Sequence, residues 1–195
     1  DSGTGRGSRS RSPRYPLDDF YGGTQLIDRP SRKSVRLPGY DYAGPGTFFL
    51  TICTFGRRQI FGEVIESQGH LSEVGHIAND EWDTTLLLRP DLVGHAFVVM
   101  PNHVHALFAI AADWERDKIM APAFANRIAR SVSSIVSGYK GAVTRGVRHK
   151  LQDDSFSVWQ RGYHEHIVKS ETTFETIYQY ILDNPARWTE DTFFP

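Results

Sequence analysis

Cysteine is almost absent from this 195-residue sequence, with Cys53 as the only one. A single cysteine excludes an intrachain disulfide and a zinc site built from several cysteines. It also fits the reducing cytoplasm, where we expect the protein to be located. No apolar run approaches the roughly 20 residues that are needed to cross a bilayer, so we expect no membrane-spanning helix and no membrane partner.

A strong net charge is also missing, since 22 Lys and Arg balance 23 Asp and Glu to give a net charge of -1. Overall charge therefore does not indicate a nucleic-acid-binding protein. The charge is unevenly distributed, however, because residues 118–152 contain no acidic residue. The basic residues of this tract are Lys118, Arg127, Arg130, Lys140, Arg145, Arg148 and Lys150. Such a tract can neutralise phosphates, although a solvated helix face would have the same composition.

The first 34 residues are rich in Gly, Ser, Arg and Pro. A segment of this composition cannot bury enough apolar surface to offset the entropy lost on ordering. We therefore expect a flexible arm over residues 1–34 and a single folded domain over residues 35–195.

Hydrophobic periodicity predicts an alternation of strands and helices in this domain. The predicted strands are 47–54, 92–100, 103–110 and 158–168, with a small hairpin within 55–71 and a tight turn at Pro101–Asn102. The predicted helices begin after Ser72, at 124 and near 173, and they end before Pro90, near Gly141 to Gly146 and before Pro185. This order indicates an α+β fold, in which an antiparallel sheet carries helices mainly on one face.

Two histidines one residue apart follow the Pro101–Asn102 turn. Alternate side chains of a strand share a face, so His103 and His105 should project together. Two imidazoles on a rigid strand can form half of a metal site. They can equally be polar residues on the wet face of an antiparallel strand, and the spacing alone does not decide between these readings.

The last helix carries a second pair of polar residues, Tyr180 and Asn184, four positions apart and hence on one face. They can be functional, or Tyr180 can pack in the core while Asn184 caps the helix. Tyr178 is a rival to Tyr180, but it lies roughly 200° around the helix, so the two tyrosines cannot both face one site. A second His-x-His, His164 and His166, is an alternative metal pair in the last predicted strand.

Three segments in this order resemble the REP-associated tyrosine transposases, which belong to the IS200-like single-tyrosine HUH nucleases. The segments are 101–105 (PNHVH), 158–166 (VWQRGYHEH) and 180–185 (YILDNP). Residues 36–42 and 48–54 also resemble the start of that family, so the resemblance covers about residues 32–192. It implies a ferredoxin-like antiparallel sheet, the HUH nuclease fold.

The resemblance also implies roles for individual residues. His103 and His105 match the paired metal ligands, and Tyr180 matches the nucleophile. Asn184 stands where IS200-type enzymes often carry a glutamine that completes the metal site, but asparagine has a shorter reach. The family implies Mg²⁺ or Mn²⁺ as the cofactor. Two imidazoles and an amide oxygen suit manganese well and are unusual for magnesium.

The implied activity is metal-dependent cleavage of single-stranded DNA through a 5′-phosphotyrosine, with transfer of the strand. Recognition would involve a DNA hairpin formed by an imperfect palindrome, with the six basic residues from Arg127 to Lys150 binding its backbone. The family implies a monomer or a homodimer. Two alternatives remain open, namely a hairpin-binding module that does not cleave and a metal-dependent phosphohydrolase.

Overall fold

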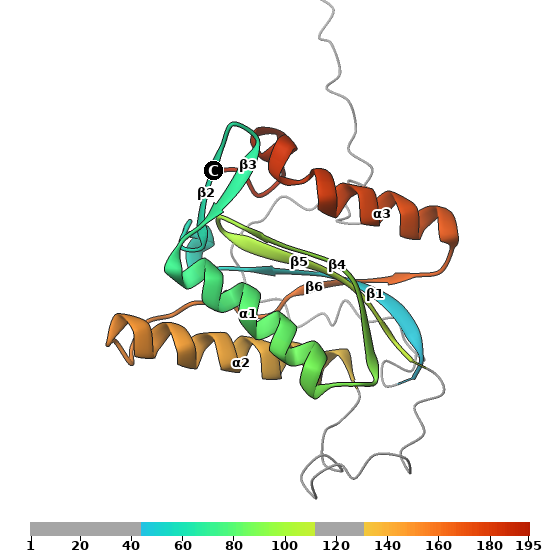
Figure 1. The fold of residues 1–195 in the computed structure, drawn as a ribbon, viewed down its shortest axis with the longest axis horizontal. Helices are drawn as coiled ribbons and strands as arrows, with labels where there is room; N and C mark the ends of the chain where they lie inside the picture. Colours follow the sequence, from blue (N-terminus) through green and yellow to red (C-terminus); the bar gives the residue numbers. More distant parts are fainter. Residues whose placement is uncertain (1–43, 112–130) are drawn as a thin grey trace, which may run out of the picture. The chain divides into compact units, whose positions relative to one another are not determined.

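An α+β fold with a four-stranded antiparallel sheet is seen in the computed structural model, which describes residues 44–111 and 131–195 (Figure 1). The strand order is β4-β5-β1-β6. The strands are β1 (Gly46–Cys53), β4 (Leu92–Met100), β5 (His103–Ile110) and β6 (His164–Val168). A separate hairpin consists of β2 (Gly62–Ile65) and β3 (Gln68–Leu71). These elements confirm the predicted strands 47–54, 92–100 and 103–110 and the predicted hairpin.

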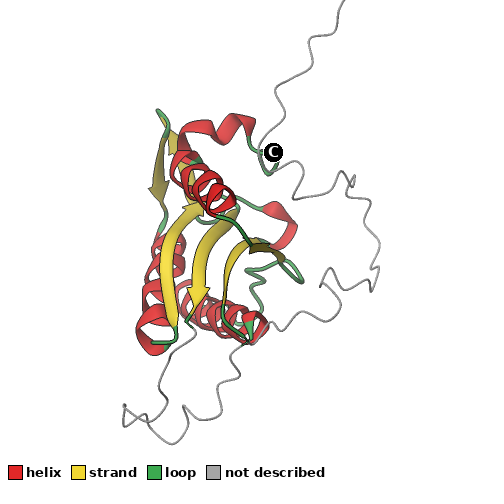
Figure 2. Ribbon diagram, turned by 90° about the vertical axis from the view of Figure 1, so that its right-hand side faces the viewer, coloured by secondary structure: helices red, strands yellow, loops and turns green. Residues whose placement is uncertain are grey.

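Helices cover both faces of the sheet (Figures 1 and 2). α1 (Glu73–Leu88) and α2 (Val132–Leu151) pack together on one face, and α3 (Glu171–Asp183) packs on β4 and β5 from the opposite side. Two short 3₁₀ segments, η1 (Phe55–Arg57) and η3 (Pro185–Glu190), follow β1 and α3. The predicted fold class is confirmed, because two of the three described α-helices share a face.

The period-two alternation of the central strands divides the sheet into two faces. The core face, beneath α1 and α2, contains Phe48, Leu50, Ile52, Val104, Ala106 and Phe108. The other face, toward α3, contains the alternate residues Phe49, Thr51, Cys53, His103, His105 and Leu107. The polar residues of β1 and β5 are therefore gathered on the face that α3 covers.

Aromatic contacts join α1 and α2 over the core face. The ring of Trp82 in α1 meets that of Tyr139 in α2 edge-on, with 5.7 Å between centroids. The buried Tyr139 hydroxyl donates a hydrogen bond to the carbonyl of Ala78 at 2.9 Å. This bond satisfies a polar group whose burial would otherwise cost about 1–3 kcal/mol.

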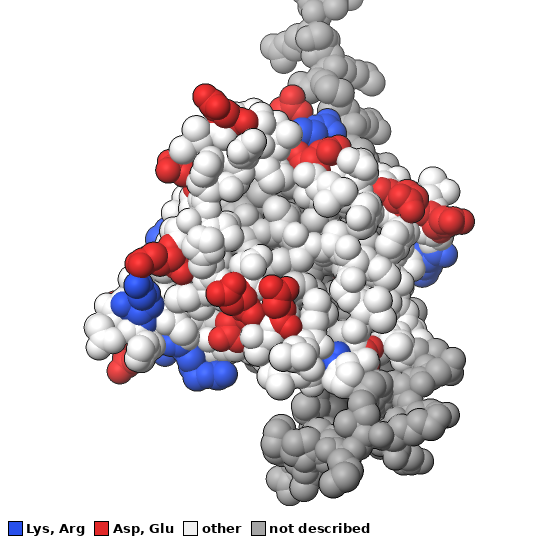
Figure 3. Space-filling model, in the orientation of Figure 1, with Lys and Arg blue, Asp and Glu red and all other residues white. Residues whose placement is uncertain are grey.

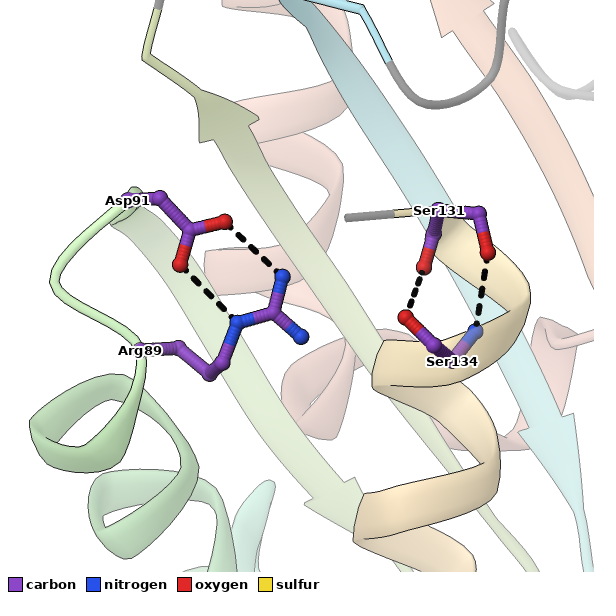
Figure 4. Close-up of polar contacts among 4 residues, drawn as sticks. All are labelled: Arg89, Asp91, Ser131 and Ser134. Atoms are coloured by element: carbon purple, nitrogen blue, oxygen red, sulfur yellow. Dashed lines mark hydrogen bonds and ion pairs between the residues drawn. The ribbon is translucent and has the colours of Figure 1, made fainter. Parts of the chain in front are cut away.

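Local polar contacts set where the helices begin. The side chains of Ser72, Ser131 and Ser170 cap α1, α2 and α3 by accepting hydrogen bonds from backbone N–H groups. Figure 4 shows this arrangement for Ser131 and Ser134, together with the ion pair between Arg89 and Asp91. That pair is bidentate and buried, and it holds the short connection from α1 to β4.

The end predicted for the second helix is wrong, since α2 continues through Gly141 and Gly146 to Leu151. Glycine in a helix costs about 1 kcal/mol, which packing can offset. Here the apolar stripe continues with the buried residues Val143 and Val147, so the helix gains more by extending than by stopping. The predicted start at residue 124 lies outside the described residues, among which α2 begins after its cap Ser131.

The last strand is also shorter than predicted, because β6 begins at His164 rather than at Val158. The preceding chain makes a single bridge between Thr54 and Trp159 and then turns at Gly162, which has a φ of 81°. Glycine adopts this left-handed conformation without the steric strain of a side chain. α3 starts at Glu171, two residues before the predicted position. The arm predicted over residues 1–34 lies outside the described residues, whose helices are all too short or too polar to cross a membrane.

Candidate active site

His103 and His105 lie side by side on β5, with their Nε2 atoms 3.0 Å apart. β5 starts immediately after the Pro101–Asn102 turn, so both imidazoles project from a strand that is hydrogen-bonded on both sides. Both side chains are completely buried, at 0% exposure. The predicted sharing of one face is confirmed, and the reading of these histidines as residues on a wet strand face is wrong.

The Nδ1 atoms of the two histidines are each held by a neighbouring polar side chain. Asn102 donates from Nδ2 to the carbonyl of Phe193 at 2.7 Å, so its Oδ1 faces His103 Nδ1, 2.8 Å away. An oxygen acceptor there requires the His103 proton on Nδ1 and leaves a lone pair on Nε2. His105 Nδ1 lies 2.9 Å from Thr51 Oγ1, a hydroxyl that can donate or accept. These partners orient both Nε2 atoms toward a common point.

Burial makes both imidazoles hard to protonate. Loss of hydration, with a smaller effect from the nearby charge of Arg57, lowers the pKa of His103 to about 3. Burial likewise lowers the pKa of His105 well below its ordinary value, with a smaller effect from His103. Both residues are therefore neutral at pH 7, and neutral imidazole is the form that binds a metal ion.

Tyr180 reaches this histidine pair from α3, which covers the face of the sheet that carries both histidines. Its hydroxyl lies 3.3 Å from His105 Nε2 and donates to Asp191 Oδ2 at 3.2 Å. Ile177 and Ile181 are the buried residues of α3. Tyr178, the rival tyrosine, instead stacks on Phe174 with 6.1 Å between ring centroids.

Asn184 and Asp191 complete the polar cluster. The chain turns back through η3 after Pro185, and Asn184 Nδ2 donates to Asp191 Oδ2 at 2.8 Å. Asp191 Oδ1 accepts from the backbone N–H of Phe193 at 2.6 Å. The amide oxygen of Asn184 is buried and has no hydrogen-bond partner. An unsatisfied buried oxygen is costly, and it is an available ligand for a cation.

Asp191 is the residue that sequence reasoning missed. One ligand atom each from His103, His105 and Asp191 lie within 4.8 Å of one another. Two imidazole nitrogens and a carboxylate oxygen form a donor set that could hold a divalent metal ion, and Asn184 contacts this set through its hydrogen bond to Asp191. No spacing in the sequence indicates Asp191, because its position depends on how η3 folds back.

The second His-x-His lies on the same face of the sheet as the first. His164 pairs with Thr51 of β1, and Thr51 pairs with His105, so these three residues form one row across the sheet. His166 lies in the next row, opposite Phe49. Among the described residues, the only cluster of three potential metal-ligating His, Cys, Asp or Glu side chains is the one with Asp191, which does not include this second pair.

The described basic residues of the 118–152 tract, which begin at Lys140, lie apart from the histidine pair. α2, which carries four of the six DNA-binding candidates, packs on the opposite face of the sheet (Figure 1). Lys140 donates to the carbonyls of Gln160 and Gly162, and Lys150 pairs with Glu73 at 2.7 Å. Arg148 donates to the carbonyl of Phe156. Arg127 and Arg130 lie outside the described residues, and DNA binding by the tract stays a prediction.

Comparison with known proteins finds a relative by sequence and a solved structure with a similar fold. No protein-family model matches it. A protein of Haemophilus influenzae, itself uncharacterized, is 32% identical over 170 residues, which cover 84% of this chain and 93% of that protein. The structure of a REP-associated tyrosine transposase bound to a REP hairpin aligns with a TM-score of 0.55 and 18% identity, over 80% of this chain and 74% of that one. The chain therefore belongs to the family of the Haemophilus influenzae protein, and its fold is that of a REP-associated tyrosine transposase.

Proposed function

We propose that this protein is a metal-dependent endonuclease and strand transferase that cleaves single-stranded DNA through Tyr180. The observation that carries the proposal is the position of the Tyr180 hydroxyl, 3.3 Å from His105 Nε2 and next to the only described three-ligand cluster. A nucleophile beside a metal-binding cluster is the arrangement that phosphoryl transfer requires.

In the proposed reaction the Tyr180 oxygen attacks a backbone phosphorus. A bond forms between this oxygen and phosphorus, the bond from phosphorus to the 3′ oxygen breaks, and the 3′ oxygen leaves as a hydroxyl. One phosphate ester replaces another, so the 5′-phosphotyrosine can rejoin to a 3′-hydroxyl without an external energy source. A phenol with a pKa near 10 is mostly protonated at pH 7. Asp191 accepts the Tyr180 hydrogen bond, which orients the phenol and places a carboxylate beside its proton.

We propose that His103, His105 and Asp191 hold the metal ion, with Asn184 Oδ1 as a further ligand. A bound divalent cation would offset negative charge on the phosphate oxygens. The donor set of this chain suits Mn²⁺, which accepts imidazole nitrogen more readily than Mg²⁺ does. The unpaired, buried oxygen of Asn184 supports the proposal, because a cation would satisfy it.

Single-stranded DNA next to a hairpin is the proposed substrate, and the transposase with this fold is bound to such a hairpin. The charges of the protein restrict where DNA can lie. α1 contains Glu73, Asp80, Glu81 and Asp83 but no lysine or arginine, and Figure 3 shows carboxylates gathered over this helix. This surface would repel phosphates, so we expect the strand to reach Tyr180 from another side.

The test is to incubate the full-length protein and Mn²⁺ with a pool of DNA hairpins that carry randomised single-stranded arms. Mass spectrometry should then find one nucleotide-bearing peptide, with the modification on Tyr180. Tyr180→Phe should abolish the adduct and retain hairpin binding. Tyr178→Phe is the matched control, because it removes the same hydroxyl from a residue that packs away from the histidines, and it should retain the adduct.

Three results would contradict the proposal in different ways. Hairpin binding without any adduct would indicate a binding module. Hydrolysis of a small phosphate ester at an unchanged rate by Tyr180→Phe would indicate a phosphohydrolase. An adduct on Tyr178 would show that the nucleophile is assigned wrongly.

A further inference from the structure

The face of the sheet that carries the candidate active site extends beyond the part on which α3 packs. α3 packs mainly on β4 and β5, whereas β1 and β6 continue the same face toward the edge of the sheet. The row that begins at His105 continues through Thr51 to His164, whose side chain is exposed. Phe49 and Thr51 are buried, so the exposed part of this face begins beyond β1, at His164.

Arg57 lies beside this part of the face. It is the last residue of η1, directly after β1, and its backbone has a left-handed φ of 54°. A non-glycine residue in this conformation is strained, and such strain is concentrated at functional positions. The guanidinium lies over the ring of Phe193, 5.2 Å from its centroid, and that ring is 4.7 Å from the ring of His103.

The positive charge of Arg57 affects one histidine of each His-x-His pair. It is the second cause, after burial, of the lowered pKa of His103, and also of the lowered pKa of His164. Arg57 is thus close enough to influence the inner histidine of the cluster and the outer histidine of β6. Within residues 44–111 and 131–195, no carboxylate forms an ion pair with it, whereas Arg89, Lys150 and Arg187 each have one.

Arg58, the next residue, makes different contacts. Its guanidinium donates to the carbonyls of Ser157 and Phe55 and lies over the ring of Phe156, 4.8 Å from the centroid. These contacts join η1 to the segment before β6. The two adjacent arginines therefore have distinct surroundings, since Arg58 binds backbone carbonyls and Arg57 lies over the ring of Phe193.

We propose that Arg57 forms a subsite that binds the phosphodiester next to the one that Tyr180 attacks. A guanidinium presents paired N–H groups that match phosphate oxygens. This inference rests on the proposed function for the identity of the strand. It adds a site that follows the end of β1, on the face of the sheet opposite α2 and away from the acidic surface of α1.

The test measures binding in full-length Tyr180→Phe protein, in which cleavage does not interfere. The probe is a fluorescent single-stranded 20-mer of randomised sequence, titrated at several salt concentrations. Arg57→Gln should weaken binding about 10- to 100-fold, the usual effect of a lost charged hydrogen bond. It should also reduce the slope of the logarithm of affinity against the logarithm of salt concentration by about one, because one fewer counterion is released. Arg58→Gln, with the same change of charge one residue away, should leave the salt dependence unchanged.

A second measurement locates the contact on the DNA. In oligonucleotides that wild-type protein cleaves, the phosphates around the cleaved bond are replaced one at a time by uncharged methylphosphonates. At one position adjacent to the cleaved bond, this replacement should remove the difference in DNA affinity between wild-type protein and Arg57→Gln. Arg57→Lys, which retains the charge, should bind DNA with an affinity between those of wild type and Arg57→Gln. An unchanged free energy of unfolding of the variants would exclude misfolding as the cause.

The outcomes separate the subsite from the proposed function. Equal losses of binding and salt dependence for Arg57→Gln and Arg58→Gln would overturn the subsite, even if wild-type protein forms the Tyr180 adduct. A selective loss for Arg57→Gln supports the subsite, even if no adduct forms and the nuclease proposal fails. An Arg57 effect that persists at every methylphosphonate position would also overturn the inference.

Discussion

Asn102 illustrates how one side chain can set the chemistry of the site. Its amide donates to the carbonyl of Phe193, and its oxygen faces His103 Nδ1. The same residue therefore connects the turn before β5 to the C-terminal segment and selects the histidine tautomer that exposes Nε2. Such supporting partners commonly influence metal affinity about 10- to 100-fold.

We expect Asn102→Leu to reduce Mn²⁺ affinity by about 10- to 100-fold, because His103 would lose the acceptor that holds its proton on Nδ1. Asn102→Asp is the matched variant, since it keeps an oxygen for His103 while losing the donor to Phe193. It should retain wild-type affinity or exceed it. Calorimetric titration with Mn²⁺ distinguishes the two, and an equal loss in both variants would show that the tautomer is not the cause.

The two buried histidines should also make stability depend on pH in the absence of metal. In the unfolded chain they bind protons below about pH 6.5, whereas in the folded protein the pKa of His103 is lowered to about 3. Between these values the unfolded state binds more protons, so the free energy of unfolding falls as pH is lowered. Each histidine contributes at most about 1.4 kcal/mol per pH unit, and nothing well above pH 6.5.

Urea unfolding in EDTA at pH 7.5 and 5.5 measures this effect. His103→Gln is the comparison, because it removes one of the two groups and should lose less stability over the same interval. The quantity to compare between the two proteins is the change in the free energy of unfolding per pH unit, and not the absolute stability. Identical slopes for wild type and His103→Gln would contradict the assignment of His103 as a buried neutral imidazole.

At the scale of elements, the close contact between α1 and α2 depends on a glycine. A Cβ added at Gly146 would lie 2.8 Å from Cγ2 of Ile77, whereas a Cβ added at Gly138 would meet no atom within 4 Å. Both glycines are in α2, where alanine is the better helix former. The two positions therefore separate helix propensity from interhelical packing.

Gly138→Ala should raise the free energy of unfolding by up to about 1 kcal/mol, because only propensity changes. Gly146→Ala should lower it by about 1–3 kcal/mol, since the branched Ile77 side chain has little freedom to move away. Denaturant titration of both variants tests this. Stabilisation by Gly146→Ala would show that α1 and α2 can separate at no cost.

At the scale of the whole molecule, the site is assembled within one chain. β6 pairs with β1, and only Lys169 and Ser170 connect β6 to α3. α3 then packs on β4 and β5 of the same chain and delivers Tyr180 to His105. A connection this short restricts where the helix can go, so each chain should supply its own nucleophile.

Mixing two inactive proteins, His105→Ala and Tyr180→Phe, should therefore yield no DNA adduct beyond the sum of the two measured separately. An exchange of α3 between chains would instead join intact Tyr180 to intact His105 and restore the adduct. Wild-type protein mixed with each variant is the control for inhibition by the inactive partner. Sedimentation of the same samples would decide between monomer and homodimer.

Local patterns in the sequence were enough to predict most of the fold and half of the site. β-branched runs, the Ser72 cap and the Pro101–Asn102 turn act on neighbouring residues, so they predicted β1, β4, β5 and the start of α1, and they placed the start of α3 within two residues. The same holds for the shared face of His103 and His105, which follows from strand geometry alone. The boundaries of α2 and β6 were predicted less well, because burial of Val143 and Val147 and pairing with β1 are set by distant residues.

The sequence by itself determined an α+β fold, a strand with two histidines on one face and, with the family resemblance, the choice of Tyr180. The tertiary structure alone placed Tyr180 of α3 against His105 of β5, added Asp191 through η3 and gave Arg57 and Arg58 different contacts. The physical reason is that spacing along the chain specifies which residues share a strand or helix face. Whether two such faces meet depends on how the apolar surfaces of separate elements pack.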